Sequence, residues 1–395
     1  MKQLTLGIFG FGCVGQGLYH VLHETKGIKA QIKKICIKDI HKVREIDTSF
    51  FTDNKYELLD DPEIDIIVEL INDPEAAYVL TKEALIRGKS VVSANKKMIA
   101  THIKEFIQLQ EDYKGSLLYE GSCCASIPII RNLEEYYDND LLTGVEGIFN
   151  GTSNFILTKI FDDGISFNDA VSEAQRLGFA ETDPSSDIDG FDSKFKLCII
   201  LLHSFGVFVD PADVFNFGIS RLNDFDIDYA KKHNYRIKLV ARCFKLNNTI
   251  YAYCIPQFIS KENKLFNVKN EYNGVVIESA FSENQVFIGK GAGSRPTGSA
   301  VLSDIAALRY NYQYEYKKVN QVEELEISND LDLRVYVRFN SGQELDEQIF
   351  TNIQERYSSE EYSFVIGNIK LDQLIKLINT DKQGIQIILA NRFFD

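Results

Sequence analysis

Asp192 and Lys196 stand four residues apart in the stretch 174–196, which reads AQRLGFAETDPSSDIDGFDSKFK. On a helix this spacing places both side chains on one face, where a carboxylate can orient an ammonium group. An unperturbed lysine has a pKa of about 10.4, so its ammonium form can donate a proton at neutral pH. The pair therefore predicts a general acid, although an ordinary ion pair on a surface helix has the same spacing.

The segment that leads to this pair reads as a helix, a polar turn and a second helix. We expect the first helix to end at Gly178 in a left-handed cap, and the second to begin near Gly190 with Asp187 or Asp189 as its cap. Pro184 should stiffen the turn between them. A calcium loop is also excluded. If Asp187, Asp189 and Gly190 were the third, fifth and sixth positions of such a loop, Lys196 would stand where the bidentate glutamate belongs, and its positive charge would oppose the metal.

A glycine-rich loop, GFGCVG at residues 10–15, lies between an apolar run at 4–9 and a helical pattern at 16–24. In a Rossmann fold these glycines permit a tight turn and bring a pyrophosphate close to a helix N-terminus, whose N–H groups attract anions. The position at the start of a strand-helix unit favours a dinucleotide site over a glycine turn without a ligand.

The end of the second predicted strand, residues 32–37, should read the adenosine ribose. An acid there favours NAD, whereas nearby cations accept the extra phosphate of NADP. Lys38 precedes Asp39, and Lys42 and Arg44 follow. The pattern is mixed and favours NADP slightly, with use of both cofactors left open, because these charges could also be solvated on a loop.

Two further strands are expected at 64–71 and 90–93, separated by a helix at 75–87. The first is a nearly continuous apolar run, as in a parallel strand that is covered on both faces. The second ends in Ser93, Asn95 and Lys96, which places a lysine at the carboxyl edge of the sheet, where open α/β folds bind ligands. An ordinary surface lysine at a helix start is the alternative for Lys96.

Three long blocks resemble homoserine dehydrogenases. The stretch 174–196 matches the family signature at fixed gaps, the stretch 147–157 (GIFNGTSNFIL) resembles a second block, and the stretch 287–304 (FIGKGAGSRPTGSAVLSD) resembles a third. The signature positions in the first block are Ala174, Gly178, Phe179, Ala180, Asp183, Pro184, Asp187, Ile188, Gly190, Asp192 and Lys196. The SANK sequence at 93–96 is also similar to the family's strand-end motif.

This resemblance implies reduction of L-aspartate 4-semialdehyde to L-homoserine by NAD(P)H. Hydride delivery to an aldehyde leaves charge on its oxygen, so a proton donor must lie within hydrogen-bond reach. The resemblance assigns this role to Lys196, with Asp192 as its orienting partner and Lys96 sharing the proton chemistry or holding the substrate. The implied substrate-binding residues are Glu181, Asp187, Lys96, Gly151 and Thr152, while Asp183, Asp189 and Lys194 are interpreted as capping or surface residues.

The resemblance also implies a cofactor site and an ion site. The cofactor is NADP or NAD, and its predicted contacts are Gly10, Gly12, Cys13, Val14, Gly15, Lys38, Ser93, Asn95, Lys96, Gly291 and Gly293. The ion is a monovalent cation, usually sodium, and its predicted ligands are Glu120 through its side chain and Cys123, Ala125 and Ile127 through their carbonyls. Cys124 and Ser126 stand where the family usually has glycines.

The expected fold class is α/β, with three domains. We predict a Rossmann-type dinucleotide-binding domain at 1–128, completed by residues 291–310, and an α+β substrate and dimerisation domain with a mixed sheet at 129–290. The tail at 320–395 resembles an ACT-type regulatory module. Its pattern predicts strands at 333–339, 362–366 and 385–390, with helices at 344–357 and 371–378.

Composition excludes several classes of protein. A formal net charge of -14 over 395 residues disfavours nucleic acid and anionic membranes as partners. No apolar run reaches membrane-spanning length, and MKQLTLGIFG does not read as a signal peptide, so a cytoplasmic location is expected. Seven scattered cysteines without a CxxC pair predict small buried side chains and no disulfide framework. A homodimer or homotetramer acting on a small molecule is expected, without a fused kinase domain.

Two alternatives remain open at this stage. Another Rossmann reductase of a related amino acid aldehyde or keto acid would share the glycine loop and the lysine. A nucleotide-sensing regulator would share the glycine loop and the ACT-like tail, but it would bind the cofactor without turnover. A panel of aldehyde substrates, with turnover measured by the change in cofactor absorbance, separates these two alternatives from homoserine dehydrogenase activity.

Overall fold

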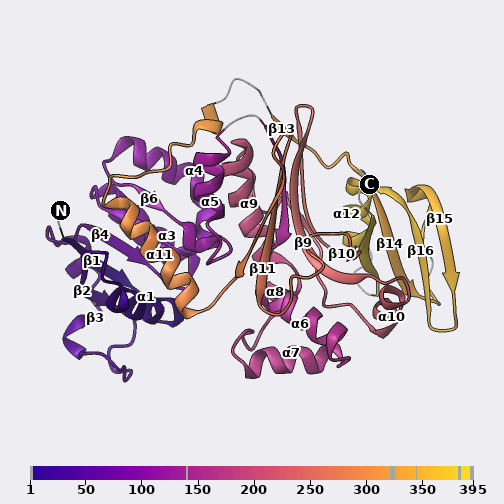
Figure 1. Cartoon of the computed structure of the whole chain (residues 1–395), viewed down its shortest axis with the longest axis horizontal. Coiled ribbons are helices and arrows are strands. Elements are labelled where there is room, and N and C mark those ends of the chain that lie inside the picture. Colours follow the sequence, from indigo (N-terminus) through magenta and orange to yellow (C-terminus); the bar gives the residue numbers. More distant parts are fainter. Residues whose placement is uncertain (1–2, 139–140, 321–324, 344, 381–383, 392–395) are drawn as a thin grey trace. The chain divides into compact units, whose positions relative to one another are not determined.

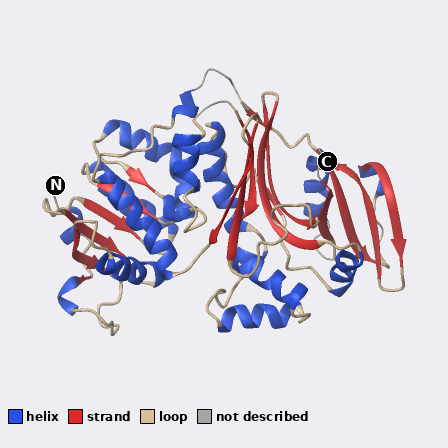
Figure 2. Ribbon diagram, viewed as in Figure 1, coloured by secondary structure: helices blue, strands red, loops and turns tan. Residues whose placement is uncertain are grey.

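A computed structural model describes residues 3–138, 141–320, 325–343, 345–380 and 384–391 (Figure 1). Contacts within the chain group it into two compact units. Unit 1 comprises Met1–Asp138 and Gly289–Asn320, and unit 2 comprises Asn139–Ile288 and Gln321–Asp395. Helices alternate with short strands in unit 1, whereas long strands dominate unit 2 (Figure 2). By its contacts the tail belongs to unit 2. The division into three domains stays a prediction.

Unit 1 is built on a six-stranded sheet in which every neighbouring pair of strands is parallel. The order β3-β2-β1-β4-β5-β6 reverses direction between β1 and β4, which is where open α/β sheets bind their ligands. The predicted Rossmann-type fold is confirmed. The strands are β1 (Leu4–Phe9), β2 (Ala30–Cys36), β3 (Phe51–Thr52), β4 (Ile66–Glu69), β5 (Ser90–Ser93) and β6 (Leu117–Leu118).

Helices cover both faces of this sheet, because right-handed crossovers on either side of the switch point place α1 and α3 on opposite faces. A Cβ at Gly17 would lie 1.9 Å from the Ser294 carbonyl oxygen, so this glycine allows α1 and α11 to touch. The helices are α1 (Cys13–Glu24), α2 (Tyr56–Leu59), α3 (Pro74–Ile86), α4 (Lys96–Asp112), α5 (Ile129–Arg131) and α11 (Ser294–Leu308), with single turns η1 (Thr48–Phe50), η2 (Glu120–Ser122), η3 (Asn132–Tyr136) and η4 (Lys317–Asn320).

Unit 2 contains an eleven-stranded mixed sheet in the order β12-β11-β7-β9-β10-β17-β14-β16-β15, with β8 and β13 also paired to β10. The predicted mixed sheet is confirmed, since β10 is antiparallel to β9 and parallel to β17. The strands are β7 (Leu142–Ile148), β8 (Phe215–Asn216), β9 (Arg236–Leu246), β10 (Thr249–Ile259), β11 (Tyr272–Ser279), β12 (Glu283–Lys290), β13 (Glu326–Ile327), β14 (Asp332–Asn340), β15 (Phe350–Ser358), β16 (Tyr362–Lys370) and β17 (Gln386–Asn391).

The central helix of unit 2 is α9 (Phe191–Phe205), which packs on β7, β9 and β10 and is buried on nearly all sides. It begins after Gly190 and ends before Gly206, both in the left-handed region. This burial excludes the alternative of an exposed surface helix for the Asp192–Lys196 pair. The other helices are α6 (Gly151–Asp162), α7 (Phe167–Arg176), α8 (Ser185–Ile188), α10 (Asp224–Lys232) and α12 (Leu371–Thr380), with the turn η5 (Glu347–Ile349).

The predicted helix at 344–357 is wrong. Residue 344 lies outside the described residues, η5 covers 347–349, and residues 350–358 form β15, an edge strand antiparallel to β16. Register shifts between Phe350 and Asn352 and between Ile353 and Glu355 interrupt the ladder, and such bulges destroy the period of two by which a strand is read. The apolar residues 345, 349, 353 and 357 consequently fall at helical spacing.

The other predicted tail elements are confirmed as β14, β16, α12 and β17. Within the tail the strand order is β17-β14-β16-β15, that is, fourth, first, third and second along the chain, and all three pairs are antiparallel. The assignment of this tail to the ACT type stays a prediction.

Candidate functional site

The predicted Asp192–Lys196 pair forms one contact inside unit 2. Lys196 Nζ donates to Asp192 Oδ2 and to the Phe149 carbonyl oxygen, each at 2.7 Å. Lys196 is only 6% exposed and Asp192 only 3%. A buried ammonium group held by a carboxylate and a carbonyl has a fixed direction, which a proton donor needs.

Asn150 links this pair to the rest of the site. Its Nδ2 donates to Asp192 Oδ2 at 2.9 Å and to Asp187 Oδ1 at 2.6 Å, while its Oδ1 accepts the N–H of Ser153 and caps α6. Asn150, and not Thr152 or Ser153, therefore caps this helix. The sequence of the block at 147–157 suits Asn150, Gly151 and Thr152 to binding near the nicotinamide, but it does not predict the contacts of Asn150 with Asp187 and Asp192, because these partners lie 37 and 42 residues away.

The expected caps of α9 are wrong. Gly190 precedes this helix and no side chain caps it, because Asp187 is held by Asn150 and Asp189 accepts a hydrogen bond from Ser220. Gly178 does take the predicted left-handed conformation.

The remaining predicted substrate residues differ in how open they are. Glu181 is exposed, whereas Gly151 and Thr152 are buried, and the Thr152 hydroxyl donates to the Phe179 carbonyl oxygen at 2.6 Å. Lys194 is buried at 8% exposure with its Nζ 5.0 Å from the Phe191 ring centre, so its interpretation as a capping or surface residue is wrong. Burial lowers the pKa of Lys194.

The glycine loop of unit 1 has the geometry that a dinucleotide needs. Gly10 has a φ of +94°, and a Cβ there would lie 2.6 Å from the Leu70 carbonyl oxygen. A Cβ on Gly12 would meet no atom within 4 Å, and no side chain caps α1 where it begins at Cys13. The loop therefore offers exposed backbone and an uncapped helix N-terminus to an anion.

The loop at 291–293 joins this region. The Ser294 hydroxyl donates to the Cys13 carbonyl oxygen at 2.8 Å, and Gly293 precedes α11 with a φ of +119°. The predicted cofactor residues of the glycine loop and of the third block thus lie together within unit 1.

A cavity of about 560 Å³ opens at the switch point. Its walls come from the ends of β1, β2 and β4 and from the loop after β2. The lining includes the predicted Gly10, Gly12 and Lys38, and it adds Asp39, Lys42 and Arg44. An adenosine half of a dinucleotide matches this position in the fold.

The predicted Ser93, Asn95 and Lys96 lie at the carboxyl end of β5. The Asn95 side chain accepts the Met98 N–H at 3.0 Å and caps α4, and Lys96 is the first residue of that helix. Lys96 is half-buried. The expected position of this lysine at the edge of the sheet agrees with the structure.

Glu120 of the predicted cation site is buried and hydrogen-bonded. Its carboxylate oxygens accept the N–H groups of Ile130 and Arg131, each at 2.9 Å, and its own N–H donates to Asp304 Oδ2 at 2.8 Å. Burial raises the pKa of Glu120 to about 7, and burial followed by the Glu120 charge raises the pKa of Asp304 to about 8. One guanidinium, that of Arg131, faces both carboxyls.

The turn beside Glu120 holds the other predicted ligands. Cys124 and Ala125 have φ values of +53° and +39°, so the chain adopts left-handed conformations here without the family's usual glycine at 124. In the described ranges no group of three or more His, Cys, Asp or Glu side chains is placed to hold a metal.

Most of the cysteines are buried, as predicted. Cys123, Cys124, Cys198, Cys243 and Cys254 are buried, Cys36 is intermediate and Cys13 is exposed. Burial raises the pKa of Cys198 and of Cys254 to about 12, which disfavours the reactive thiolate.

None of the helices in the described ranges is long and apolar enough to cross a membrane.

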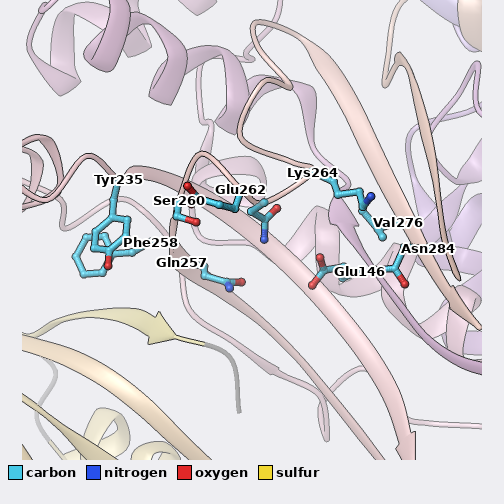
Figure 3. Close-up of a pocket in the computed structure, with 10 residues that line it drawn as sticks. Glu146, Tyr235, Gln257, Phe258, Ser260, Glu262, Lys264, Val276 and Asn284 are labelled. Carbon is cyan, nitrogen blue, oxygen red and sulfur yellow. The ribbon is translucent and has the colours of Figure 1, made fainter. Parts of the chain in front are cut away.

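Another cavity, of about 450 Å³, lies in unit 2. None of the predicted site residues lines it. Figure 3 shows Glu146 and Gln257 on neighbouring parts of its wall, with Lys264 and Asn284 at the side of Glu146. Arg242 Nε lies 3.9 Å from Glu146 Oε2, so this carboxylate belongs to an ion-pair group of the sheet.

Comparison with known families agrees with both units. A model described as "Homoserine dehydrogenase, NAD binding domain" matches residues 10–120, and one described as "Homoserine dehydrogenase" matches residues 128–306. The homoserine dehydrogenase of Bacillus subtilis is 35% identical over 320 residues, which cover 79% of this chain and 74% of that protein. The chain belongs to the homoserine dehydrogenase family.

Solved homoserine dehydrogenases share the fold. A crystal structure from Thiobacillus denitrificans has a TM-score of 0.87 and 28% identity and covers 99% of both chains. A hyperthermophilic archaeal homoserine dehydrogenase in complex with NADPH has a TM-score of 0.67 and 27% identity and covers 79% of this chain and 99% of its own. This chain is therefore an NAD(P)-dependent oxidoreductase with homoserine dehydrogenase function.

Proposed function

We propose that this homoserine dehydrogenase reduces L-aspartate 4-semialdehyde to L-homoserine with NAD(P)H, and that Lys196 supplies the proton. The observation that carries the proposal is the buried contact of Lys196 with Asp192 and the Phe149 carbonyl. The bound cofactor would supply hydride to the aldehyde carbon. Lys196 would then transfer a proton from Nζ to the aldehyde oxygen, while Asp192 keeps the ammonium oriented.

The carboxylates of Asp187 and Glu181 suit the amino acid end of the substrate. Asp187 is half-buried beside Asn150, and Glu181 is exposed, so both can approach an ammonium group. We propose Lys96, at the start of α4, as a further contact to the substrate or as a partner in the proton chemistry. The residues proposed to hold the cofactor are Gly10, Gly12, Cys13, Val14, Gly15, Lys38, Ser93, Asn95, Lys96, Gly291 and Gly293.

The reaction is tested with purified full-length protein and L-aspartate 4-semialdehyde, by following the loss of NADPH or NADH absorbance. Turnover of this aldehyde, and of related amino acid aldehydes or keto acids only at much lower kcat/KM, is expected. A protein that binds NADPH without reducing any aldehyde would instead be a nucleotide sensor.

We further propose that NADPH is preferred over NADH. The acid that could read the NAD ribose, Asp39, has its Oδ1 engaged by the N–H groups of His41 and Lys42 at 2.9 and 3.2 Å. Arg44 is held at the same cavity, because its Nη1 donates to the Asp39 and Lys42 carbonyls and its guanidinium carbon lies 5.0 Å from the Phe51 ring centre. A fixed guanidinium suits a ribose phosphate.

Replacing Arg44 by alanine should lower kcat/KM with NADPH by about 10- to 100-fold, since hydrogen bonds to charged groups contribute about 1.5–3 kcal/mol. Values with NADH should change by less than about threefold. Arg87→Ala is the matched control, because it removes an arginine of unit 1 that pairs with Asp60 and Glu83 instead. Equal losses with both cofactors would refute the role of Arg44.

A sodium ion at Glu120 is also proposed. When Glu120 and Asp304 are both ionised, they place two buried negative charges against the single charge of Arg131. A hard monovalent cation or a proton would neutralise the excess, and carboxylate and carbonyl oxygens have a second lone pair to offer. Glu120, Cys123, Ala125 and Ile127 would hold the ion.

Without sodium, the free energy of unfolding should fall as the pH rises from about 5 to about 8. Both carboxyls have raised pKa values in the folded state, so the folded state binds more protons than the unfolded state in this range. Sodium chloride in place of choline chloride should raise the Tm at about pH 8 and have less effect at about pH 5.5. Glu120→Gln should remove the sodium effect. Identical melting in both salts would exclude the ion.

We propose a homodimer or homotetramer in the cytoplasm as the working form. The supporting feature is β12, which is an edge strand of the unit 2 sheet and exposes Phe281, Val286 and Ile288 at or next to it. Exposed apolar edge strands are surfaces on which a second chain can pair. The mass in solution tests this assembly.

A further inference from the structure

The carboxylate of Glu69 lies inside unit 1 at a place that the predicted site residues do not include. Glu69 is the last residue of β4 and is fully buried. In the sheet it is paired with Phe9 at the end of β1 and with Ser93 at the end of β5. A carboxylate in the middle of a parallel sheet carries a desolvation cost and is retained only with hydrogen-bond partners.

Both oxygens of Glu69 are used, and they bind two different strand ends. Oε1 accepts the N–H of Ile71 at 2.7 Å, and Oε2 accepts the hydroxyl of Ser93 at 2.6 Å. The first bond holds the chain as it leaves β4, and the second holds the chain as it leaves β5.

Asn95 closes these bonds into a ring. Its N–H donates to Ser93 Oγ at 3.0 Å, and its Nδ2 donates to the Ile71 carbonyl oxygen at 3.1 Å. Ile71 is thus fixed through both its N–H and its carbonyl, and Asn95 is fixed on two sides while its Oδ1 caps α4.

We propose that Glu69 is a positioning residue that sets the distance between the wall of the dinucleotide cavity and the start of α4, where Lys96 stands. Ile71 lines that cavity together with Leu70 and Asn72. Ser93 and Asn95 lead directly to Lys96. A single buried carboxylate therefore controls two segments that must be in register for the cofactor to bind productively.

The chemistry of the group supports this role. Burial raises the pKa of Glu69 to about 7, and the hydrogen bonds from the Ser93 hydroxyl and the Ile71 N–H offset part of this rise, so these two partners stabilise the ionised form against the cost of burial. A leucine would fill the space but would leave a buried N–H and a buried hydroxyl without an acceptor. The proposal deepens the proposed dehydrogenase function and depends on it for its kinetic readout.

The test is a double-mutant cycle of Glu69→Ala and Ser93→Ala in the full chain, with Glu69→Gln as the conservative variant. Glu69→Ala should raise the Kd for NADPH and lower kcat, by about 10- to 100-fold in kcat/KM, as expected for reacting groups displaced by about 1 Å. Ser93→Ala should give a similar loss, and the double variant should lose less than the product of the two single losses, because both single variants remove the hydrogen bond between Glu69 and Ser93.

Glu69→Gln should recover most of the kcat, because its amide can accept the Ile71 N–H and donate to Ser93 Oγ. The matched control is Thr81→Val, which alters a fully buried side chain of α3 whose hydroxyl donates to Met98 Sδ, away from the strand ends. Its kcat and Kd should equal those of the wild type.

Wild-type kcat and Kd in a folded Glu69→Ala variant would overturn the proposal, as would losses that multiply in the double variant. If Glu69→Ala does not fold, Glu69→Leu, which fills the space without offering an acceptor, takes its place in the cycle with Ser93→Ala and is judged by the same criterion. The Kd for NADPH is measured by cofactor fluorescence without aldehyde. A wild type that binds NADPH but does not turn over would refute the proposed reaction and still leave this cycle to be read in Kd.

Discussion

Replacing Lys196 by methionine should lower kcat for aldehyde reduction by about 10²- to 10⁴-fold, which is the contribution of a positioned proton donor. Methionine keeps most of the side-chain volume inside the buried helix α9 but carries no proton. The Kd for NADPH should change by less than about threefold, because the predicted cofactor residues lie in unit 1 and Lys196 lies in unit 2. Single-turnover reduction, together with NADPH fluorescence titration, separates the two effects.

The control for this variant must account for the partner charge. Removing Lys196 leaves Asp192 with its Asn150 contact but without the ammonium, and a lone buried charge costs about 3–5 kcal/mol of stability. The double variant Lys196→Met with Asp192→Asn restores neutrality and should fold better while staying inactive. Lys194→Met, on the same helix, should retain wild-type kcat. A Lys196→Met enzyme with wild-type turnover would refute the assignment.

The elements of unit 1 could be predicted because their physics is local. The runs that become β1, β4 and β5 are apolar and buried on both faces, and a glycine loop marks the turn from β1 to α1. The tail shows where this reasoning fails. The bulges of β15 depend on its pairing with β16, and that pairing is invisible in the spacing of residues 345–357.

The site divides in the same way. The Asp192–Lys196 contact follows from a spacing of four on a helix and was predictable. The bridge from Asn150 to Asp187 and Asp192 joins segments about 40 residues apart, so no local pattern reports it. Glu69 did leave a signal, because it is a carboxylate inside the apolar run IDIIVELI. A charge in a strand covered on both faces has to be satisfied by something nearby.

A buried ion pair between Arg338 and Asp226 ties the tail to the rest of unit 2. Arg338 of β14 donates through Nε to Asp226 Oδ1 at 2.8 Å, and the Tyr336 hydroxyl donates to the same oxygen at 3.0 Å. Asp226 lies in α10, where it also completes a capping box with Asn223. Arg338 is 4% exposed and Asp226 is fully buried. A regulatory module that moved as a separate body would have to break this contact.

Burial raises the pKa of Asp226 even though Arg338 lowers it, so desolvation outweighs the attraction between the two charges. Breaking the pair therefore costs mainly because the remaining charge stays buried. Asp226→Ala should lower the free energy of unfolding by about 3–5 kcal/mol, measured by urea denaturation at neutral pH. The double variant Asp226→Leu with Arg338→Met should recover most of this loss, because it leaves no buried charge.

Lys376→Ala provides the scale for that comparison. It removes an ion pair with Asp372 on the exposed face of α12, where the side chains are 66% and 42% exposed, and it should change the free energy of unfolding by less than about 1 kcal/mol. Separate unfolding transitions for the tail and for the rest of unit 2 in the wild type would show that Asp226 does not couple them. A single transition that shifts as a whole in Asp226→Ala would show that the tail unfolds together with the rest of unit 2, which contains Lys196.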